Sequence, residues 1–322
     1  MRPLFLAAII VLLGLPAAAL SQTAPYHAGI MRSPVAVAAP FEMLVWYPSD
    51  AAEVPWQVGP FVIPASRDVS IASGRFSVVL LSHGGGLTGG TPLLLRELSA
   101  ALARQGFIVV APFHGKTGLR ARTFQVSQAL DAALADARFA SHADAARIGM
   151  IGFSLGTAVT LEVAGGIPNA ARLVTYCGAH PDDAMSCDHA PDGNNGPALE
   201  QAVPVRLAPL PKLALKAIVL LDPFGALFGH DELSAVTMPV LLFRPDRSEL
   251  PGAPNGLGIA DALPRPPQIE MVPGRHFIFA DVCPPDLRSA APAVCEDPPG
   301  VDRPTVHTDV EARIARFLRN NL

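Results

Sequence analysis

Short runs of aliphatic and β-branched residues recur along the chain and alternate with longer segments of helical periodicity. The apolar runs occupy residues 41–47, 76–81, 107–111, 148–152, 215–221 and 239–243, with a weaker candidate at 269–272. A strand that is apolar at nearly every position is buried on both faces, which is typical of a parallel sheet between two helical layers. The helical segments lie at 91–104, 123–140, 157–164 and 310–318. This alternation predicts one α/β domain with a mostly parallel central sheet flanked by helices on both faces.

The first 21 residues have the layout of a cleavable export signal. A short positive start, Met1–Pro3, precedes an apolar stretch from Leu4 to Leu15 and the small residues Ala17–Ala19. About a dozen apolar residues are too few to cross roughly 30 Å of hydrocarbon as a helix, but they suit a secretory signal peptide. We therefore expect cleavage near Ala19 to Ser21, a mature domain at 22–322, and a periplasmic or secreted protein. An uncleaved anchor is the alternative.

Charge and hydropathy narrow the classes of partner. The 322 residues carry a formal net charge of −4, 16% of them are charged, and the mean hydropathy is +0.34. Nucleic-acid binding relies on clustered Lys and Arg, and the sequence contains no such cluster. After the leader, every apolar stretch is broken by a charge, proline or glycine before it reaches about 18 residues, so no membrane span is expected in the mature chain.

Four cysteines fall into two local pairs, Cys177 with Cys187 and Cys283 with Cys295. In an exported chain an even number of cysteines indicates disulfides, and each pair would close a short loop. Neither spacing matches C-x-x-C, which argues against a zinc or thioredoxin-type site. Four unpaired buried thiols are the alternative.

Residues 178–211 interrupt the alternation with an irregular excursion rich in Asp, Pro, Gly and Asn. Its groups that are capable of binding a metal are Asp182, Asp183, Asp188, His180 and His189. Their spacing matches neither an EF-hand loop nor a zinc site. We expect no metal here, and the role of the excursion stays open.

The sequence Gly152-Phe153-Ser154-Leu155-Gly156 carries the strongest chemical signal. It follows one apolar run and precedes the helical segment that starts at residue 157. A serine in a tight strand-to-helix turn, flanked by small residues, is lifted to the carboxyl edge of the sheet. This context predicts Ser154 as a nucleophile, with a glycine-rich turn of no catalytic function as the alternative.

A second glycine-rich segment, Ser82–Gly86, directly follows the run 76–81. Glycines let backbone N–H groups approach a developing oxyanion, and the N–H of Leu155 is expected to be a further donor. His83 within this segment is expected to be structural. His114, after the next run, is expected either to line the pocket or to hold its own loop.

In folds that carry a nucleophilic serine at such a strand-to-helix turn, the general base follows it in the chain order Ser, acid, His. The histidines that satisfy this order are His180, His189, His230, His276 and His307. His276 comes immediately after the last candidate strand, where a loop brings a ring within reach of Ser154. We therefore expect His276 to be the base.

Two carboxylates compete for the role of orienting acid. Asp222 ends one apolar run and Asp246 follows the next, so both emerge at the same edge of the sheet. A carboxylate directly after apolar residues needs a partner, which favours Asp222. Asp246 remains the alternative acid, and Glu249 is a more distant third.

With serine, acid and histidine in this order, the chain resembles an α/β-hydrolase. More narrowly, it is similar to the exported dienelactone-hydrolase-like proteins related to platelet-activating-factor acetylhydrolase. The similarity rests on Ser82–Gly84 followed by a helix and Ala103–Val109, on the strand end Leu220–Asp222, and on His276–Asp281.

The resemblance implies a nucleophile at Ser154, an acid at Asp222, a base at His276, and oxyanion donors at Gly85 and Leu155. The chain departs from the family in two ways. Dienelactone hydrolases use a cysteine at the position of Ser154. Many relatives place the acid after the later strand, where this chain has Asp246.

These residues predict a serine hydrolase that cleaves carboxylic esters through an acyl-enzyme on Ser154. Nucleophile and base both come from the chain, so no cofactor is expected, and the expected partner is a small-molecule or lipid-like ester. The length of the acyl chain is open. Two other functions fit the same residues: a non-catalytic binding protein on a hydrolase scaffold, and a peptidase or acyltransferase that uses the same three side chains.

Overall fold

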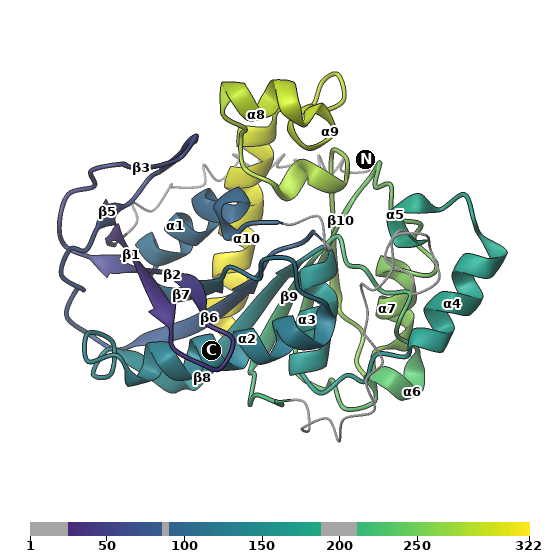
Figure 1. Ribbon diagram of the computed structural model, residues 1–322, viewed down its shortest axis with the longest axis horizontal. Coiled ribbons are helices and arrows are strands. Elements are labelled where there is room, and N and C mark those ends of the chain that lie inside the picture. The colour runs from purple at the N-terminus through teal and green to yellow at the C-terminus, as the bar shows by residue number, and fades with distance from the viewer. Residues whose placement is uncertain (1–24, 86–89, 188–210) are drawn as a thin grey trace, which may run out of the picture.

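A nine-stranded β-sheet runs through the part of the chain that the structure, a computed structural model, describes: residues 25–85, 90–187 and 211–322. The strands lie in the order β11-β10-β9-β8-β6-β7-β2-β1-β5 (Figure 1). Their bounds are β1 His27–Val35, β2 Phe41–Ser49, β5 Ser66–Arg67, β6 Phe76–Ser82, β7 Phe107–Pro112, β8 Ala143–Phe153, β9 Ala217–Leu221, β10 Val240–Pro245 and β11 Gln268–Val272. A separate hairpin is formed by β3 Trp56–Val58 and β4 Phe61–Ile63.

Most of the sheet is parallel. β6 pairs in parallel with β7 and β8, and parallel pairing continues through β9 and β10 to β11. β2 is antiparallel both to β7 and to β1. Because parallel strands end at one edge, the segments that follow β6, β8, β9 and β10 all leave the sheet there, and ligands of open α/β sheets bind at this edge.

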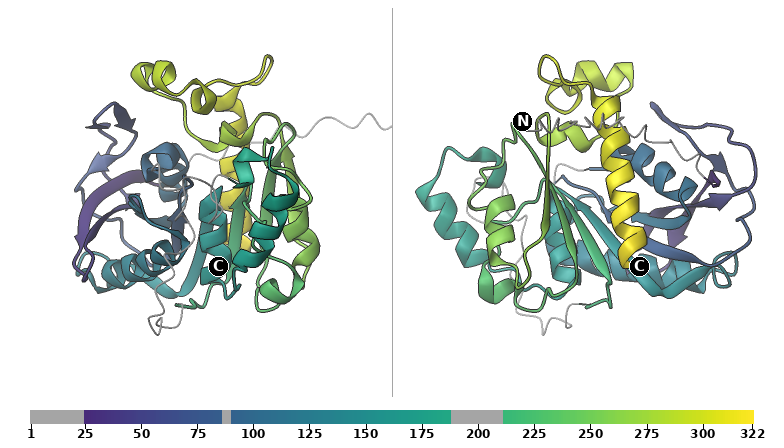
Figure 2. Two further views of the ribbon diagram at one scale, coloured as in Figure 1. Left: turned by 45° about the vertical axis from the view of Figure 1, so that its right-hand side comes forward. Right: turned by 180° about the vertical axis from the view of Figure 1, so that it is seen from behind.

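Helices cover both faces of the sheet. α2 Leu119–Ala135 and α3 Leu155–Val163 lie on one face, and α1 Arg96–Arg104 and α10 Arg303–Asn321 lie on the other (Figure 1, Figure 2). Successive residues of β9 alternate between the two cores: Ile218 and Leu220 pack in one, Val219 and Leu221 in the other. The fold class predicted from the apolar runs is therefore confirmed.

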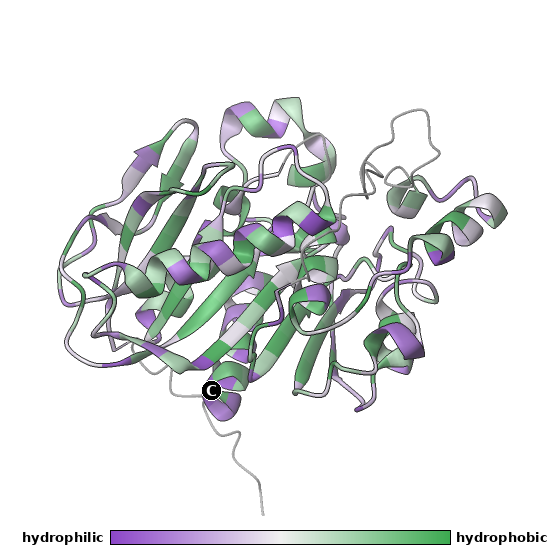
Figure 3. Ribbon diagram, turned by 60° about the horizontal axis from the view of Figure 1, so that its bottom comes forward, coloured by the Kyte–Doolittle hydropathy of each residue, from purple (hydrophilic) through white to green (hydrophobic). Residues whose placement is uncertain are grey.

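The two cores account for much of the high mean hydropathy. Hydrophobic residues are concentrated along the strands, as Figure 3 shows, and all residues of β6, β7 and β9 are buried. Among the described residues, no helix combines the length and the apolar character that crossing a membrane requires. The predicted signal peptide falls within residues 1–24, which lie outside the described residues.

The seven predicted strands are all present, and the differences lie in the helices and the outer strands. The predicted helix 123–140 starts earlier, at Leu119, and ends at Ala135, because Asp136 turns to an extended conformation. The last helix also begins earlier, at Arg303, where the side chain of Asp302 accepts a hydrogen bond from Thr305 N. The predicted helix 91–104 begins as a 3₁₀ turn, η1 Pro92–Leu95, and continues as α1. Short helices that the periodicity did not predict are α4 Ala170–Ala179, α5 Ala184–Cys187, α6 His230–Leu233, α7 Gly256–Ala262, α8 Pro285–Ala290 and α9 Pro292–Cys295, with the 3₁₀ turn η2 His276–Phe279.

Both predicted cysteine pairs form disulfides. Cys177–Cys187 joins α4 to α5, and Cys283–Cys295 closes the loop that contains α8. The predicted excursion 178–211 therefore begins as a helical, cross-linked segment, and its residues 188–210 lie outside the described residues. Each disulfide restricts a loop of similar length, 10 or 12 residues in sequence separation.

Replacing both cysteines of either pair by serine is expected to lower the free energy of unfolding by about 2–4 kcal/mol. The reason is that the unfolded chain gains the freedom that the closed loop removed. Chemical denaturation of the two double variants beside the unmodified protein measures this loss. A Cys283→Ser/Cys295→Ser protein with an unchanged free energy of unfolding would contradict the structural role of that bridge.

Candidate active site

Ser154 occupies a strained turn between β8 and α3. Its φ of 54° lies in the left-handed region that a residue with a side chain rarely adopts, and its N–H donates to Leu221 O at 3.1 Å. The flanking glycines allow the turn to close. A Cβ at Gly152 would lie 2.4 Å from Gly156 O, and one at Gly156 would lie 2.0 Å from Ser82 O. The G-x-S-x-G spacing is thus required by packing, and it leaves the Ser154 side chain at the sheet edge.

The structure brings Ser154, His276 and Asp222 together. His276 Nε2 lies 2.9 Å from Ser154 Oγ, and His276 Nδ1 lies 2.7 Å from Asp222 Oδ2. The Asp222 side chain is 0% exposed and that of His276 is 1% exposed. A buried carboxylate that accepts a hydrogen bond from Nδ1–H leaves Nε2 free to accept the serine proton, which is the arrangement of a nucleophile, base and orienting acid.

Asp222 also has an unusual backbone. Its φ is 39°, and its N–H donates to Phe243 O at the end of the neighbouring strand β10. Among the described residues, positive φ outside glycine occurs at Asp68, Ser154 and Asp222. Two of these three residues, Ser154 and Asp222, are the ones that contact the His276 ring, and strained backbone of this kind clusters at functional sites.

The other two candidate acids hold the backbone beside His276. Asp246 Oδ1 accepts from Gly274 N at 2.9 Å, and Glu249 Oε2 accepts from His276 N at 2.9 Å. Both carboxylates therefore fix the segment that carries the imidazole, while Asp222 contacts the ring. The ring of Phe153 stacks on that of His276 with centroids 5.1 Å apart, which fixes the plane of the imidazole.

The carboxylate of Asp222 has two further neighbours from the end of β10. Ser248 Oγ donates to Asp222 Oδ2 at 2.5 Å, the same oxygen that accepts from His276. Arg244 Nη1 lies 3.9 Å from Asp222 Oδ1. Within residues 25–85, 90–187 and 211–322, neither Asp222 Oδ1 nor Arg244 Nη1 has a hydrogen-bond partner.

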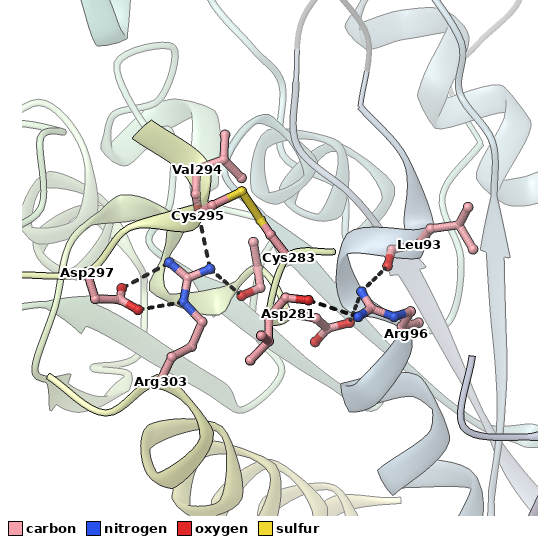
Figure 4. Close-up of a disulfide and its surroundings, with 10 residues drawn as sticks. Leu93, Arg96, Asp281, Cys283, Val294, Cys295, Asp297 and Arg303 are labelled. Atoms are coloured by element: carbon pink, nitrogen blue, oxygen red, sulfur yellow. Dashed lines mark hydrogen bonds and ion pairs between the residues drawn. A yellow bond between two sulfur atoms is a disulfide. The ribbon is translucent and has the colours of Figure 1, made fainter. Parts of the chain in front are cut away.

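Arg303 and Asp297 fix the segment that follows His276 through hydrogen bonds and an ion pair (Figure 4). Arg303 Nη1 donates to Ala280 O at 2.9 Å and to Val294 O at 3.0 Å, and its guanidinium pairs with Asp297. Val294 immediately precedes Cys295, so the disulfide and the arginine fix the same short loop. The buried side chain of Arg303 therefore links three residues that follow His276 in the chain: Ala280, Val294 and Asp297.

Arg96 from α1 fixes the same segment from the other side (Figure 4). It donates to Leu93 O and Val282 O, each at 3.0 Å, and pairs with Asp281 at 3.5 Å. Burial raises the pKa of Asp281 well above its ordinary value, although Arg96 acts in the opposite direction. The turn η2 is therefore anchored on both sides, which favours a rigid position for His276.

The predicted oxyanion loop packs directly on the nucleophile. A Cβ at Gly84 would lie 2.8 Å from Ser154 Cβ and 3.3 Å from Ser154 Oγ, so only glycine fits this approach. Gly85 follows with a φ of 81°, and Leu155 is the first residue of α3. The first N–H groups of a helix have no partner within the helix. Both predicted donors thus belong to segments that meet at Ser154.

Gly84→Ala is expected to lower kcat/KM for a p-nitrophenyl ester by about 100-fold in a folded protein, because a small displacement of reacting groups costs that much. The new methyl group would crowd Ser154 Cβ and Phe153 O, at 2.8 and 3.2 Å. Gly178→Ala is the matched control, since a Cβ there meets no atom within 4 Å. A Gly84→Ala protein with the kcat/KM of the control would show that this approach is not needed.

The imidazoles of His83 and His114 pack against the predicted oxyanion loop that starts at Ser82. His114 Nε2 lies 2.9 Å from Ser82 Oγ, and His114 Nδ1 lies 2.8 Å from Gln125 Oε1. Burial lowers the pKa of His83 to about 3, assisted by the nearby charge of Arg122, and burial lowers the pKa of His114 well below its ordinary value. Both rings are uncharged at neutral pH and hold the loop through hydrogen bonds, as expected for His83.

The remaining candidate histidines lie away from Ser154. His180 stacks on Tyr176 with centroids 4.4 Å apart, His230 opens α6, and His307 Nε2 lies 2.6 Å from Ile278 O. His189 lies outside the described residues. Within the described ranges, no group of three or more His, Cys, Asp or Glu side chains is arranged to hold a metal ion.

The sequence interpretation missed the groups that support the triad. Ser248, in the loop after β10, and Arg244, near the end of β10, both approach the carboxylate of Asp222. Glu249 of the same loop, considered above only as a third candidate acid, instead accepts from the backbone N–H of His276. This loop has no motif, and its only signal was its place after a predicted strand. Phe153, the variable residue before Ser154, gave no indication that its ring would cover the imidazole.

Comparison with known proteins bears on the architecture. No protein-family model matches the chain, and no curated protein matches it. Among solved structures, it is similar to a ferulic acid esterase from Streptomyces cinnamoneus, with a TM-score of 0.61 over 95% of this chain and 92% of that chain.

The chain shares its fold, a mostly parallel sheet flanked by helices, with this esterase. The two sequences are 19% identical, so the likeness to the ferulic acid esterase concerns the fold. The comparison therefore confirms the mostly parallel sheet between helical layers.

Proposed function

We propose that the protein is a serine hydrolase of carboxylic esters. The observation that carries the proposal is the chain of contacts from Ser154 Oγ through His276 to Asp222, at 2.9 and 2.7 Å. The fold that it shares with a ferulic acid esterase supports an ester substrate. A peptidase or acyltransferase would use the same triad, and the likeness to an esterase favours ester hydrolysis over these.

In the proposed mechanism His276 Nε2 takes the proton of Ser154 as its Oγ attacks the ester carbonyl. Asp222 holds the imidazole in the tautomer with the proton on Nδ1 and stabilises the imidazolium that forms. The N–H groups of Gly85 and Leu155 are the proposed donors to the oxyanion. The imidazolium then protonates the departing alcohol, and water attacks the acyl-enzyme with His276 again as base.

We propose further that the protein is exported and acts on a small-molecule or lipid-like ester. The two disulfides support an oxidising compartment, since such bonds are rare in the cytosol. The narrower likeness to dienelactone-hydrolase-like proteins belongs to the same proposal. It rests on the segments around Ser82, Asp222 and His276.

The test is a comparison of matched substrates with the purified protein. p-Nitrophenyl esters of two, four and eight acyl carbons are assayed beside the p-nitroanilides of the same acids. We expect turnover of at least one ester, far slower turnover of the anilide, and complete inactivation by a fluorophosphonate. Absence of turnover for all the esters would contradict the proposed function, and faster cleavage of the anilide would favour a peptidase.

A further inference from the structure

No carboxylate from the loop after β10 contacts the imidazole ring of His276 in the described structure. The loop instead contacts Asp222, the acid that does bond to the ring. Asp222 Oδ2 accepts two hydrogen bonds, from His276 Nδ1 at 2.7 Å and from Ser248 Oγ at 2.5 Å. Bonds to a carboxylate are short and roughly twice as strong as bonds between neutral groups. One oxygen of Asp222 is therefore held between the imidazole and a hydroxyl.

Ser248 is itself fixed by the backbone of its loop. Its Oγ accepts from Leu250 N at 3.1 Å, and of the two acceptors near its hydroxyl Asp222 Oδ2 is at 2.5 Å and Leu250 O at 3.5 Å, so the shorter bond goes to Asp222. Arg244 Nη2 donates to Leu250 O at 3.2 Å and ties the same turn to the end of β10. The contacts of Leu250 with Ser248 and Arg244 thus hold the Ser248 hydroxyl beside Asp222.

Arg244 supplies a positive charge on the other side of the carboxylate. Its Nη1 lies 3.9 Å from Asp222 Oδ1, and both atoms are buried without a hydrogen-bond partner among the described residues. A fully buried carboxylate is costly unless it is paired. The arginine offsets this cost through its charge, without competing for the oxygen that orients His276.

We propose that Ser248 and Arg244 are positioning residues of the triad acid: Ser248 aims Asp222 Oδ2 at His276, and the charge of Arg244 offsets the cost of burying the Asp222 carboxylate. This inference rests on the proposed function and deepens it. It explains how an acid at the end of β9 serves His276, because the end of β10 and the loop that follows it, where Asp246 lies, provide the groups that hold Asp222. Neither residue is expected to touch the substrate.

Ser248→Ala is expected to lower kcat about 10- to 100-fold with KM unchanged, the loss expected for one hydrogen bond to a charged group. Ser248→Thr, which keeps the hydroxyl, is expected to recover most of the lost kcat. Ser234→Ala is the matched control, because this exposed serine donates to a carbonyl in its own turn. In the Asp222→Asn background, Ser248→Ala should change kcat by less than about twofold, since an amide at residue 222 no longer orients the imidazole and Ser248 has no acid to position.

Two further readouts separate positioning from general loosening of the structure. The low-field proton resonance of His276 Nδ1–H should shift in Ser248→Ala and return in Ser248→Thr. Arg244→Gln should lower kcat, whereas the same substitution at Arg247, an exposed arginine three residues later, should not.

The outcomes distinguish this inference from the proposed function. A Ser248→Ala protein with the kcat and the His276 resonance of the unmodified protein would overturn the inference, while loss of activity in Ser154→Ala would leave the function standing. A loss of kcat that Ser248→Thr does not recover, or that persists in full in the Asp222→Asn background, would also overturn the inference.

Discussion

Ser154→Ala is expected to lower kcat for a p-nitrophenyl ester by at least about 10⁴-fold, because a triad without its nucleophile keeps only oxyanion and binding effects. Ser154 Oγ lies 2.9 Å from His276 Nε2, and the structure places no other described serine in contact with that imidazole nitrogen. Steady-state turnover with purified protein measures the loss. Labelling by a fluorophosphonate is expected to disappear in the same variant.

The substitution should leave the fold intact. Removing one hydroxyl at the sheet edge leaves both hydrophobic cores unchanged, so the circular dichroism spectrum and thermal midpoint should stay close to those of the unmodified protein. Ser234→Ala, remote in the sequence and exposed, controls for loss of a serine hydroxyl as such. Undiminished turnover by Ser154→Ala would show that the ester is cleaved elsewhere.

Asp222→Asn is expected to lower kcat by about 10⁴-fold, because an amide at this position favours the wrong tautomer of the imidazole. The carboxylate is fully buried and bonds to His276 Nδ1 at 2.7 Å. Asp246→Asn is the matched control, since Asp246 contacts Gly274 N and not the ring. Its kcat is expected to fall by less than about tenfold, the cost of one backbone contact.

The pair of variants decides which acid serves the base. If Asp246→Asn lost as much kcat as Asp222→Asn, the acid after β10 would have to take part in the reaction in a conformation other than this one. Equal and small losses in both variants would show that His276 acts without an orienting carboxylate.

The parallel strands were predictable because their pattern is local. Every residue of β9 is buried, so its apolar sequence alone indicates a strand covered on both faces. β1 was missed because it mixes Arg32 and Ser33 with apolar residues, and its strand conformation depends on pairing with the distant β2. The 3₁₀ turn that carries His276 was missed for a similar reason, since contacts with Glu249 and Arg303 hold its surroundings.

The residues of the candidate site also fall into those with a local sequence signal and those that depend on contacts between distant segments. Ser154 and His276 have local signals, a glycine-flanked turn and a position just after a strand. The choice between Asp222 and Asp246 depends on three-dimensional placement, because both follow adjacent strands and emerge at one edge. Ser248 and Arg244 act on Asp222 across 26 and 22 residues of sequence, and no local pattern marks such contacts.

The central claim is that Ser154 forms the covalent intermediate, and peptide mapping of the inactivated protein tests it most directly. Trypsin releases residues 148–172 as one peptide, in which Ser154 is the single serine. After reaction with a fluorophosphonate, we expect one adduct per chain, on Ser154 of this peptide, in proportion to the loss of ester turnover. An adduct on another residue, or full loss of turnover without an adduct on Ser154, would contradict the account.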